Sequence, residues 1–521
     1  MTDNRRTVLP RGSDSPGQAF SAQTWVSATF ILIFTTLLSK TLGFVRDVLV
    51  ANYFGASSQV DAFTVAVTLP TLVGGIGFAL SIVFIPMYRK VLVEGGVAYG
   101  RGLVGGTVGF TVALSSLFAA ITIVFSHQIV RLLAPSLAAP TLSLAAQLAR
   151  WLAPLVLMLN LFYILGAIYN ALEHFKIPAF TDLISNVCVL FSLVALSSVM
   201  GIRSLAVGMI GGGLVVALVM AVPLVLRRIL PLYPVWNHDV QHVVILAMPV
   251  LMIEVLSQAL VLVENFFGAT LGSGNIAALG FARRLVAIVI SLLASNVAKA
   301  VFPSLSRLVS EHDLLGARHL FARLTRQYAV AFIPLSIALM YLRHDIVRLV
   351  FMHGAFDAEA AERTSAAFLY YSTGLSLAAL VTIFARACYA FGDTLVPLSA
   401  ALLQLVVISV LNYFLTPALG LIGIALSASL AIVPGLILMG SSLTRRFGGI
   451  ELGSLMRTMA LALVCSIGAL ALLPGLNWWA IMAREGVVGL IARAMVYFTA
   501  YYGLCWFFMR QELRMLLHML R

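Results

Sequence analysis

Long apolar runs separated by short polar stretches dominate this chain. Fourteen runs reach about 18 residues or more, enough for a helix rising about 1.5 Å per residue to cross the roughly 30 Å hydrocarbon core of a bilayer. They fall near residues 24–51, 58–88, 103–126, 148–171, 180–200, 203–226, 241–268, 275–303, 327–343, 366–392, 396–416, 420–442, 457–474 and 488–508. The pattern therefore predicts an all-α polytopic membrane protein with about 14 transmembrane helices.

Composition supports the membrane interpretation. Of the 521 residues, 61% are hydrophobic and 10% are charged, which is too apolar for a soluble domain. The net charge of +13 is spread over many short loops, so nucleic acid is not an expected partner. The four cysteines lie in apolar runs and are expected to be core residues. Residues 1–23 are polar and are expected to form a disordered cytoplasmic N-terminus.

The lysines and arginines between the runs predict the orientation in the membrane. With the N-terminus inside, nineteen of them fall in inner loops and tails and seven fall in outer loops. This positive-inside bias places both termini in the cytoplasm, including a tail at 509–521. The segment 304–326 has apolar residues among arginines and histidines, and is expected to be an amphipathic helix on the inner surface.

Short motifs recur in the same order at nearly constant spacing, which indicates an internal repeat. The pairs are Phe54-Gly55-Ala56 with Phe267-Gly268-Ala269, Phe84-Ile85-Pro86 with Val301-Phe302-Pro303, Tyr169 with Tyr389, and Gly201 with Gly420, at separations of 213, 217, 220 and 219 residues. We therefore expect two parallel six-helix lobes at 24–228 and 241–444, related by a pseudo-two-fold axis near the membrane normal. Two further helices follow at 457–508. In transporters of this kind the substrate site lies between the lobes.

Seven basic residues lie inside the apolar runs: Lys40, Arg46, Arg283, Arg284, Lys299, Arg386 and Arg493. A cation at mid-membrane costs about 3 kcal/mol or more unless it faces water or a partner. A basic interior favours an anionic cargo, and the guanidinium fork suits bidentate phosphate binding. The alternative is that these residues form internal ion pairs that hold helices together, such as Lys40 with Asp47 or Arg386 with Asp393.

Acidic residues in the spans have two interpretations. Asp61 opens the second run, and Glu254 and Glu264 lie about three turns apart in the seventh. Either glutamate is a candidate to neutralise the arginines, or to take up H⁺ or Na⁺ and so couple transport to a gradient or the membrane potential. The chain has no P-loop, no Gly-x-Ser-x-Gly motif and no metal-ligand spacing of histidines. An enzyme, a cofactor and a metal are therefore not expected.

Several motifs together resemble the MviN/MurJ lipid II flippase family. They are Leu38–Asp47 (LSKTLGFVRD), Phe54–Ala56 (FGA), Val60–Phe63 (VDAF), Phe175–Phe180 (FKIPAF), His353–Ala358 (HGAFDA) and Ala390–Thr394 (AFGDT). The resemblance covers residues 24–510. It implies the fold of the multidrug/oligosaccharidyl-lipid/polysaccharide exporter superfamily, with two six-helix lobes around an alternating-access cavity.

The resemblance also implies roles for individual residues. Lys40, Arg46, Asp61 and Arg284 match the functional positions of the family, and Arg283 and Asp47 are the neighbouring candidates for substrate binding and its support. The diphosphate of the cargo would lie on the cations, and Asp61 would pair with one of them after release.

Two helices depart from the family pattern. Gly74-Gly75 stands in the second span where the family has an arginine pair, and Arg283-Arg284 stands in the eighth where it has Asp-Arg. The implied function is still to flip a polyprenyl-diphosphate-linked glycan, with lipid II as the first candidate, across the bacterial cytoplasmic membrane. A different lipid-linked exopolysaccharide or O-antigen unit is the alternative cargo. Two further functions stay open, which are the export of drug-like solutes and a non-transporting role as a scaffold for cell-envelope synthesis proteins.

Overall fold

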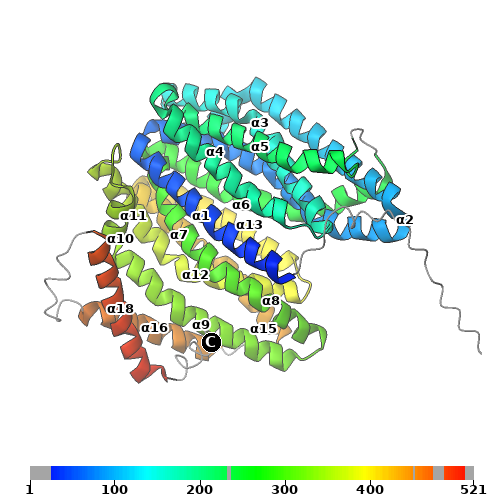
Figure 1. The fold of residues 1–521 in the computed structure, drawn as a ribbon. Helices are drawn as coiled ribbons and strands as arrows, with labels where there is room; N and C mark the ends of the chain where they lie inside the picture. The colour runs from blue at the N-terminus through cyan, green and yellow to red at the C-terminus, as the bar shows by residue number, and fades with distance from the viewer. Residues whose placement is uncertain (1–24, 232–235, 450–451, 473–485, 511–521) are drawn as a thin grey trace, which may run out of the picture. The chain divides into compact units, whose positions relative to one another are not determined.

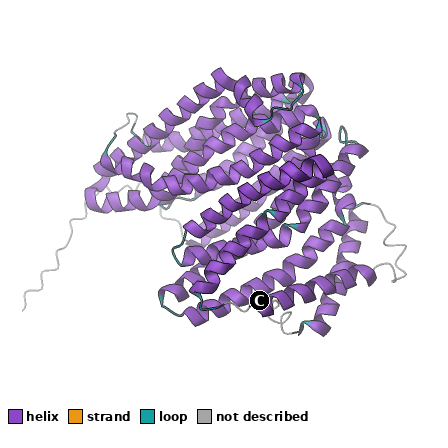
Figure 2. Ribbon diagram, turned by 180° about the vertical axis from the view of Figure 1, so that it is seen from behind, coloured by secondary structure: helices purple, strands orange, loops and turns teal. Residues whose placement is uncertain are grey.

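The computed structural model describes residues 25–231, 236–449, 452–472 and 486–510, and every regular element in these ranges is a helix (Figures 1 and 2). The first half contains α1 Trp25–Phe54, α2 Ser58–Leu133, α3 Ala139–Ala171, α4 Lys176–Met200, α5 Arg203–Leu226, α6 His238–Gly268 and η2 Ala269–Leu271. The second half contains α7 Asn275–Val289, η3 Ile290–Ala294, α8 Ser295–Ser310, α9 Leu314–Tyr341, α10 Arg343–Phe351, α11 Ala358–Thr373, α12 Leu375–Ala390, α13 Leu395–Leu419, α14 Leu421–Leu430, α15 Ile432–Arg446, α16 Leu452–Leu472 and α18 Val487–Phe508. The predicted N-terminal tail and residues 511–521 lie outside the described ranges.

The helices match the predicted membrane spans. Among the described residues, 11 helices are long and apolar enough to cross a membrane, and 13 are if each of two bent pairs counts as one span. These pairs are α9 with α10, bent by 69°, and α11 with α12, bent by 43°. α1 is 30 residues long and corresponds to the first predicted run. Each of the other predicted runs also falls on one helix or on consecutive helices. The all-α polytopic fold is confirmed.

Two predicted boundaries differ from the observed ones. The second and third runs belong to one long helix, α2, which breaks at Gly96, where φ is 71°. The predicted surface helix at 304–326 is wrong, because α8 runs to Ser310 and α9 begins at Leu314. The Asp313 carboxylate accepts a hydrogen bond from Gly316 N at 2.8 Å and so caps the start of α9. Phe321 in that helix is fully buried.

The chain falls into two compact units. Unit 1 comprises Met1–Arg46, Ala66–Ser126 and Ala146–Val255, and unit 2 comprises Asp47–Val65, His127–Ala145 and Leu256–Arg521. This division is close to the two expected lobes but does not coincide with them, so the predicted lobe boundaries stay a prediction.

The core of unit 1 is built from apolar side chains of α2, α3, α5 and α6. The rings of Phe84 and Tyr88 stack with centroids 5.3 Å apart. The Tyr169 hydroxyl donates to Met220 O at 2.9 Å, which satisfies a buried polar group and joins α3 to α5. α4 packs along α5 (Figure 1).

In unit 2, α9 is a central helix that contacts α11, α12, α16 and α18. The last helix is attached to it by two buried tyrosines, because Tyr497 donates to Pro334 O at 3.1 Å and Tyr501 donates to Val330 O at 2.8 Å. Pro334 cannot supply the backbone N–H that the Val330 carbonyl would accept inside α9, and the Tyr501 hydroxyl donates to that carbonyl instead. The two helices after the repeat are therefore fixed parts of unit 2.

The sequence repeat extends to backbone geometry. Gly201 caps the end of α4 with φ of 57°, and 219 residues later Gly420 caps the end of α13 with φ of 59°. Each glycine donates its N–H to the carbonyl four residues earlier, and φ in this region favours glycine. Between Phe267 and the next helix, η2 adds a short 3₁₀ turn at Ala269–Leu271. α2 begins four residues after Phe54 and α7 begins eight residues after Phe267, and this difference of four residues accounts for the change in motif spacing from 213 to 217.

Candidate functional site

The adjacent arginines of α7 pair with two different carboxylates. Arg284 Nη1 lies 2.9 Å from Asp47 Oδ1, and the side chains are 40% and 10% exposed. The Arg284 guanidinium also lies over the Phe281 ring, 5.9 Å from its centroid. α1 thus supplies the acid that pairs with Arg284.

Arg283 belongs to a more enclosed cluster. Its guanidinium forms an ion pair with Glu264 of α6, and the Tyr371 hydroxyl from α11 donates to Glu264 Oε2 at 2.8 Å. Glu264 is 5% exposed and Tyr371 is 7% exposed. Three helices are therefore joined through one buried carboxylate, and a buried ion pair of this kind is stable only when its remaining polar atoms are hydrogen-bonded. Sequence reasoning did not find Tyr371, which lies in an ordinary-looking Leu-Tyr-Tyr-Ser run.

Asp61 caps the start of another helix rather than lying beside a cation of α7. Its Oδ2 accepts from Gly274 N at 2.5 Å and its Oδ1 accepts from Ala277 N at 2.7 Å. These amides belong to the first turn of α7, where backbone N–H groups have no intrahelical acceptor. The side chain is 1% exposed, and the positive end of the helix favours its negative charge. Arg363 lies within electrostatic range and donates to Ser273 O at 3.1 Å.

Glycines allow the backbones around this cap to approach closely. Gly274 has φ of 81°, and a Cβ there would overlap the carbonyl oxygen of Ala56. A Cβ on Gly55 would in the same way overlap the carbonyl oxygen of Ala355, while Ala355 N donates to Asn52 O at 2.8 Å. The turn after α1, the start of α7 and the turn after α10 thus meet within unit 2.

The other predicted residues lie in unit 1. Lys40 is exposed and interacts electrostatically with Asp182 of α4. One residue earlier, Ser39 Oγ accepts from Asn186 Nδ2 at 3.1 Å, which attaches α1 to α4. Arg46 is partly buried on the same helix.

Glu254, also in unit 1, packs against the second span. A Cβ on Gly75 would lie 2.7 Å from Glu254 Cγ, so the glutamate stem occupies the space that a larger residue would need. Glu254 also interacts electrostatically with Tyr163. The two glutamates of the seventh run therefore have different surroundings, and Glu264 is the one that neutralises an arginine of α7.

The remaining intramembrane cations have different surroundings. Arg493 Nη2 lies 3.2 Å from Asp345 Oδ1, which joins α18 to α10. Arg386 lies over the Phe302 ring at 5.6 Å, and Lys299 is exposed. The interpretation that Asp393 pairs with Arg386 is wrong, because Asp393 forms its ion pair with Arg446 of α15. Because α12 ends at Ala390, Asp393 lies beyond the helix and is not on the helix face that carries Arg386.

Within the described residues, no group of three or more histidine, cysteine, aspartate or glutamate side chains is arranged to hold a metal ion. Among the predicted site residues, those of unit 2 form the two arginine–carboxylate contacts of α7 and the Asp61 cap, whereas Lys40, Arg46 and Glu254 belong to unit 1. The arrangement can bind and release an anion, or rearrange its ion pairs, without covalent chemistry.

A family model described as lipid II flippase MurJ matches residues 50–497. The probable lipid II flippase MurJ of Buchnera aphidicola subsp. Acyrthosiphon pisum is 28% identical over 420 residues, which cover 79% of this chain and 82% of that protein. The lipid II flippase MurJ of Burkholderia cenocepacia is 25% identical over 498 residues, which cover 90% and 95%.

Solved structures show the same fold. A structure of lipid II flippase MurJ in an inward closed conformation matches with a TM-score of 0.79 at 22% identity, covering 92% of this chain and 99% of that one. An inward-facing multidrug resistance MATE family transporter of the MOP superfamily matches with a TM-score of 0.69 at 12% identity, covering 81% and 96%. The superfamily fold expected from the repeat and the motifs is confirmed.

Proposed function

The chain belongs to the lipid II flippase MurJ family, and from this premise we propose that it moves lipid II from the inner to the outer leaflet of the bacterial cytoplasmic membrane. The match over most of the chain is the observation that carries the proposal. The protein is a multi-pass membrane protein, and we propose that both termini lie in the cytoplasm, as the positive-inside bias favours. The mechanism proposed is alternating access without a cofactor.

Arg284 is the residue that we propose binds the diphosphate of the cargo. Its side chain is 40% exposed although Asp47 lies 2.9 Å away. A guanidinium has five N–H donors in a fixed fork, a geometry that suits bidentate binding of a phosphate. The incoming diphosphate would compete with Asp47 for the arginine, and Asp47 would take the arginine back after release. Asp47 is thus proposed to support the site by keeping Arg284 in place between cargoes.

We assign Arg283 a positioning role beside this site. Its ion pair with Glu264, supported by Tyr371, fixes the part of α7 from which Arg284 extends. Lys40 and Arg46 are proposed to add positive charge for the same cargo. They lie on α1, the helix that also carries Asp47.

Asp61 is proposed to hold the outer ends together while the cargo enters from inside. Both of its carboxylate oxygens are hydrogen-bonded to the first turn of α7. Opening toward the outside would separate α2 from α7 and release this carboxylate, which could then meet a cation. The expectation that Asp61 pairs with a basic residue is therefore restricted to the outward-open state.

The lipid tail is proposed to lie along α18. A pocket of about 400 Å³ is lined by Leu292, Leu293, Val297, Gln327, Tyr328, Ala331, Phe332, Leu335, Phe498 and Tyr502. It is almost wholly apolar and lies between η3–α8, α9 and α18. Isoprenoid chains need such a surface and no hydrogen bonds.

Coupling to a gradient is assigned to Glu254 among the two candidate glutamates. Glu264 is already held by Arg283 and Tyr371, and proton or Na⁺ uptake there would break a buried ion pair. Glu254 lies on the same long helix outside that cluster. The membrane potential is an alternative source of energy, because the cargo itself is charged.

The test is rescue of a bacterium depleted of its own lipid II flippase. The intact chain is expected to rescue growth, and Arg284→Ala is expected to fail while reaching the membrane in normal amount. Arg284→Lys keeps the charge but not the fork and should rescue partly. Lys299→Ala removes an exposed cation of the same span and serves as the matched control.

Each outcome has a distinct meaning. Normal rescue by Arg284→Ala would remove the diphosphate-binding role of that residue. Failure of the intact chain despite good membrane expression would favour a different lipid-linked glycan as the cargo. A drug exporter would instead show efflux of cationic dyes, which a basic site does not favour. A scaffold would tolerate every charge-removing variant that folds.

A further inference from the structure

Unit 2 contains a second apolar recess, on the side of α16 that faces α11 and α12. It has a volume of about 660 Å³, which is within the usual range for ligand pockets. Its walls are Ile333, Ser336, Ile337, Met340, Tyr341, Arg343, Leu369, Thr373, Ser376, Met459, Ala460, Leu463, Ile467 and Leu470. We call this recess the α16 slot.

The α16 slot is separate from the pocket assigned to the lipid tail of the cargo. That pocket is lined by residues of α18 and of η3–α8, whereas the residues that line the α16 slot come from α9, α10, α11, α12 and α16. The two recesses lie against different faces of α9. Ile333 and Ile337 line the slot, whereas Ala331 and Leu335 line the other pocket.

The slot runs along α16. From Met459 to Leu470 on α16 it extends about 16 Å at the helical rise of 1.5 Å per residue. Small residues such as Ser336 and Ser376 leave the space open. The hydroxyls of Ser336 and Thr373 donate to carbonyls of their own helices, so these side chains present little polarity to an occupant. A single extended hydrocarbon chain fits this shape and this chemistry.

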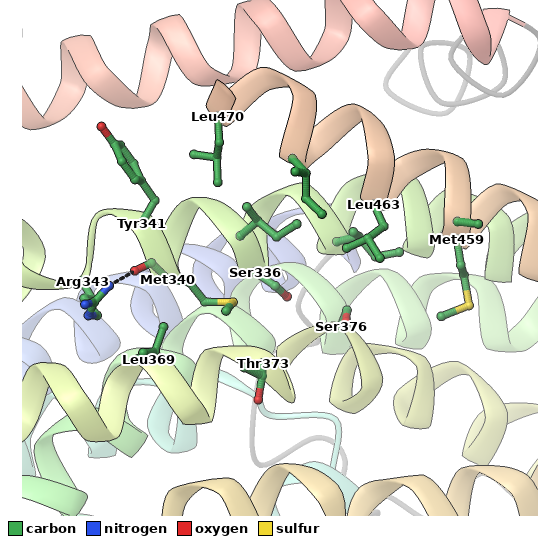
Figure 3. Close-up of a pocket in the computed structure, with 14 residues that line it drawn as sticks. Ser336, Met340, Tyr341, Arg343, Leu369, Thr373, Ser376, Met459, Leu463 and Leu470 are labelled. Carbon is green, nitrogen blue, oxygen red and sulfur yellow. Dashed lines mark hydrogen bonds between the residues drawn. The ribbon is translucent and has the colours of Figure 1, made fainter. Parts of the chain in front are cut away.

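One end of the slot is charged. Figure 3 shows Arg343 and Tyr341 at the end where Leu470 lies, with Met459 toward the other end. The only hydrogen bond of the Arg343 side chain within the described part of the chain goes to Met340 O, at 3.1 Å, and no carboxylate pairs with it there. Arginine and tyrosine together are typical of the level of the lipid headgroups.

We propose that the α16 slot binds an anionic phospholipid of the bilayer, with one acyl chain along α16 and its phosphate on Arg343. An acyl chain gains little free energy when it moves from the surrounding lipid chains to apolar protein side chains. The apolar walls therefore do not select between lipids. Selectivity comes from the guanidinium, which favours a phosphate whose charge is not balanced by a cationic headgroup. Arg343 is thus a lipid-binding residue, and Leu463 forms the wall of the chain site.

The test uses the full-length protein in detergent and native mass spectrometry. Phosphatidylglycerol and phosphatidylcholine with identical acyl chains are added in equal amounts. The intact protein is expected to retain phosphatidylglycerol about fivefold more than phosphatidylcholine, because one arginine at the membrane surface favours an anionic lipid by about this factor. Arg343→Ala should bring the ratio close to one. Arg348→Ala removes an exposed arginine of the same short helix that does not line the slot, and should leave the ratio unchanged.

A pair of neighbouring variants tests the chain site. Leu463→Trp fills the slot and should lower total bound lipid, whereas Val464→Trp, at a 65% exposed position outside the slot, should not. Equal retention of both lipids by the intact protein would overturn the proposal, and so would an equal loss with Arg348→Ala. Displacement of phosphatidylglycerol by a polyprenyl monophosphate at equal concentration would overturn the choice of a phospholipid. Arg343→Ala and Leu463→Trp change different parts of the slot. If one of them misfolds, the other still tests the proposal.

Discussion

The α3–α4 turn and the α12–α13 turn are equivalent in the two copies of the repeat, but a different ion pair holds each of them. Both have the same backbone. His174 N donates to Tyr169 O at 2.9 Å, and Asp393 N donates to Cys388 O at 3.0 Å. The residue before each has positive φ, 58° at Glu173 and 71° at Gly392.

In the second copy, Asp393 has two functions. Its Oδ1 accepts from Leu395 N at 3.0 Å and from Val396 N at 3.1 Å, so it caps α13. Its other oxygen pairs with Arg446, whose guanidinium lies over the Phe391 ring at 5.6 Å. The turn is therefore bonded to the end of α15 and to the start of α13.

In the first copy, His174 takes the place of that aspartate. Arg227 stands where the second copy has Arg446, so two basic groups face each other across the turn. The pKa of His174 is lowered by burial and by the charges of Arg227 and Lys176. The acid has moved one residue back to Glu173, which pairs with Arg89 of α2 at 3.2 Å in an exposed position. The duplicated backbone is thus kept while its polar contacts are exchanged.

The comparison teaches that backbone and side-chain contacts diverge separately after duplication. An aspartate cap with a partner is worth more than an exposed ion pair. The second-copy turn should therefore be the more stable of the two, and each of the following variants tests that difference.

The largest effect is expected from Asp393→Ala. It removes the cap of α13 and leaves Arg446 without its carboxylate, a loss of about 2 kcal/mol. The apparent melting temperature of the detergent-solubilised protein should fall by several degrees, while His174→Ala should lower it less. An equal fall for both variants would contradict the comparison.

A smaller effect is expected from the residue with positive φ. Gly392→Ala places a Cβ in the left-handed region and should destabilise by about 1 kcal/mol. Glu173→Gly removes the corresponding strain in the first copy but also the exposed pair with Arg89, and should change the melting temperature little. Thermal unfolding of both variants at one pH measures the difference. A stabilised Gly392→Ala variant would show that the turn is not held in this conformation.

Transferring the acid should strengthen the first-copy turn. His174→Asp would place a carboxylate near the first amides of α4 and beside Arg227, with an expected gain of about 0.5–1 kcal/mol. His174→Asn supplies a cap without charge and is the matched control. A melting temperature that rises for asparagine as much as for aspartate would mean that Arg227 contributes nothing.

The smallest effect is a pH dependence of stability. Since the pKa of His174 in the folded protein lies below its ordinary value of 6.5, the unfolded chain binds the proton more tightly. The contribution to stability is present above that ordinary value and is lost as the pH falls through it toward the folded pKa. His174→Gln should therefore show a smaller decrease in melting temperature between neutral and mildly acidic pH. An identical pH profile for both proteins would exclude this contribution.

The hydrophobic pattern was sufficient to predict the helices because each span is long and apolar enough to be distinguished by itself. The repeat was also visible, since turns such as Gly201 and Gly420 need the same residue type in both copies. The bends within helices could not be predicted from the hydrophobic pattern. The 69° bend before α10 lies in a run that contains no proline at that point, and the five-residue π-helix at Ile290–Ala294 has an ordinary sequence.

The charged residues of the site were found, but their partners were not. Composition shows that acids must accompany arginines in a membrane, yet pairing depends on which helices are neighbours. Arg284 and Asp47 are far apart in sequence and meet through α1 and α7. Asp61 was expected to pair with a cation once the cargo leaves, and in this structure it accepts hydrogen bonds from two backbone amides at the start of α7. Backbone donors at a helix start leave no signal in the residue types themselves.

In the proposed transport cycle, the Asp61 cap would also determine how well the membrane is sealed between transport events. Two hydrogen bonds from amides to a carboxylate are together worth about 3 kcal/mol or more. Since about 1.4 kcal/mol is a factor of ten in an equilibrium, they reduce spontaneous parting of the outer ends by about a hundredfold. Ions and small solutes would leak through a carrier that opens while empty. The same bonds must break once in each cycle, so a tighter seal slows turnover, and one carboxylate sets the balance between leakage and speed.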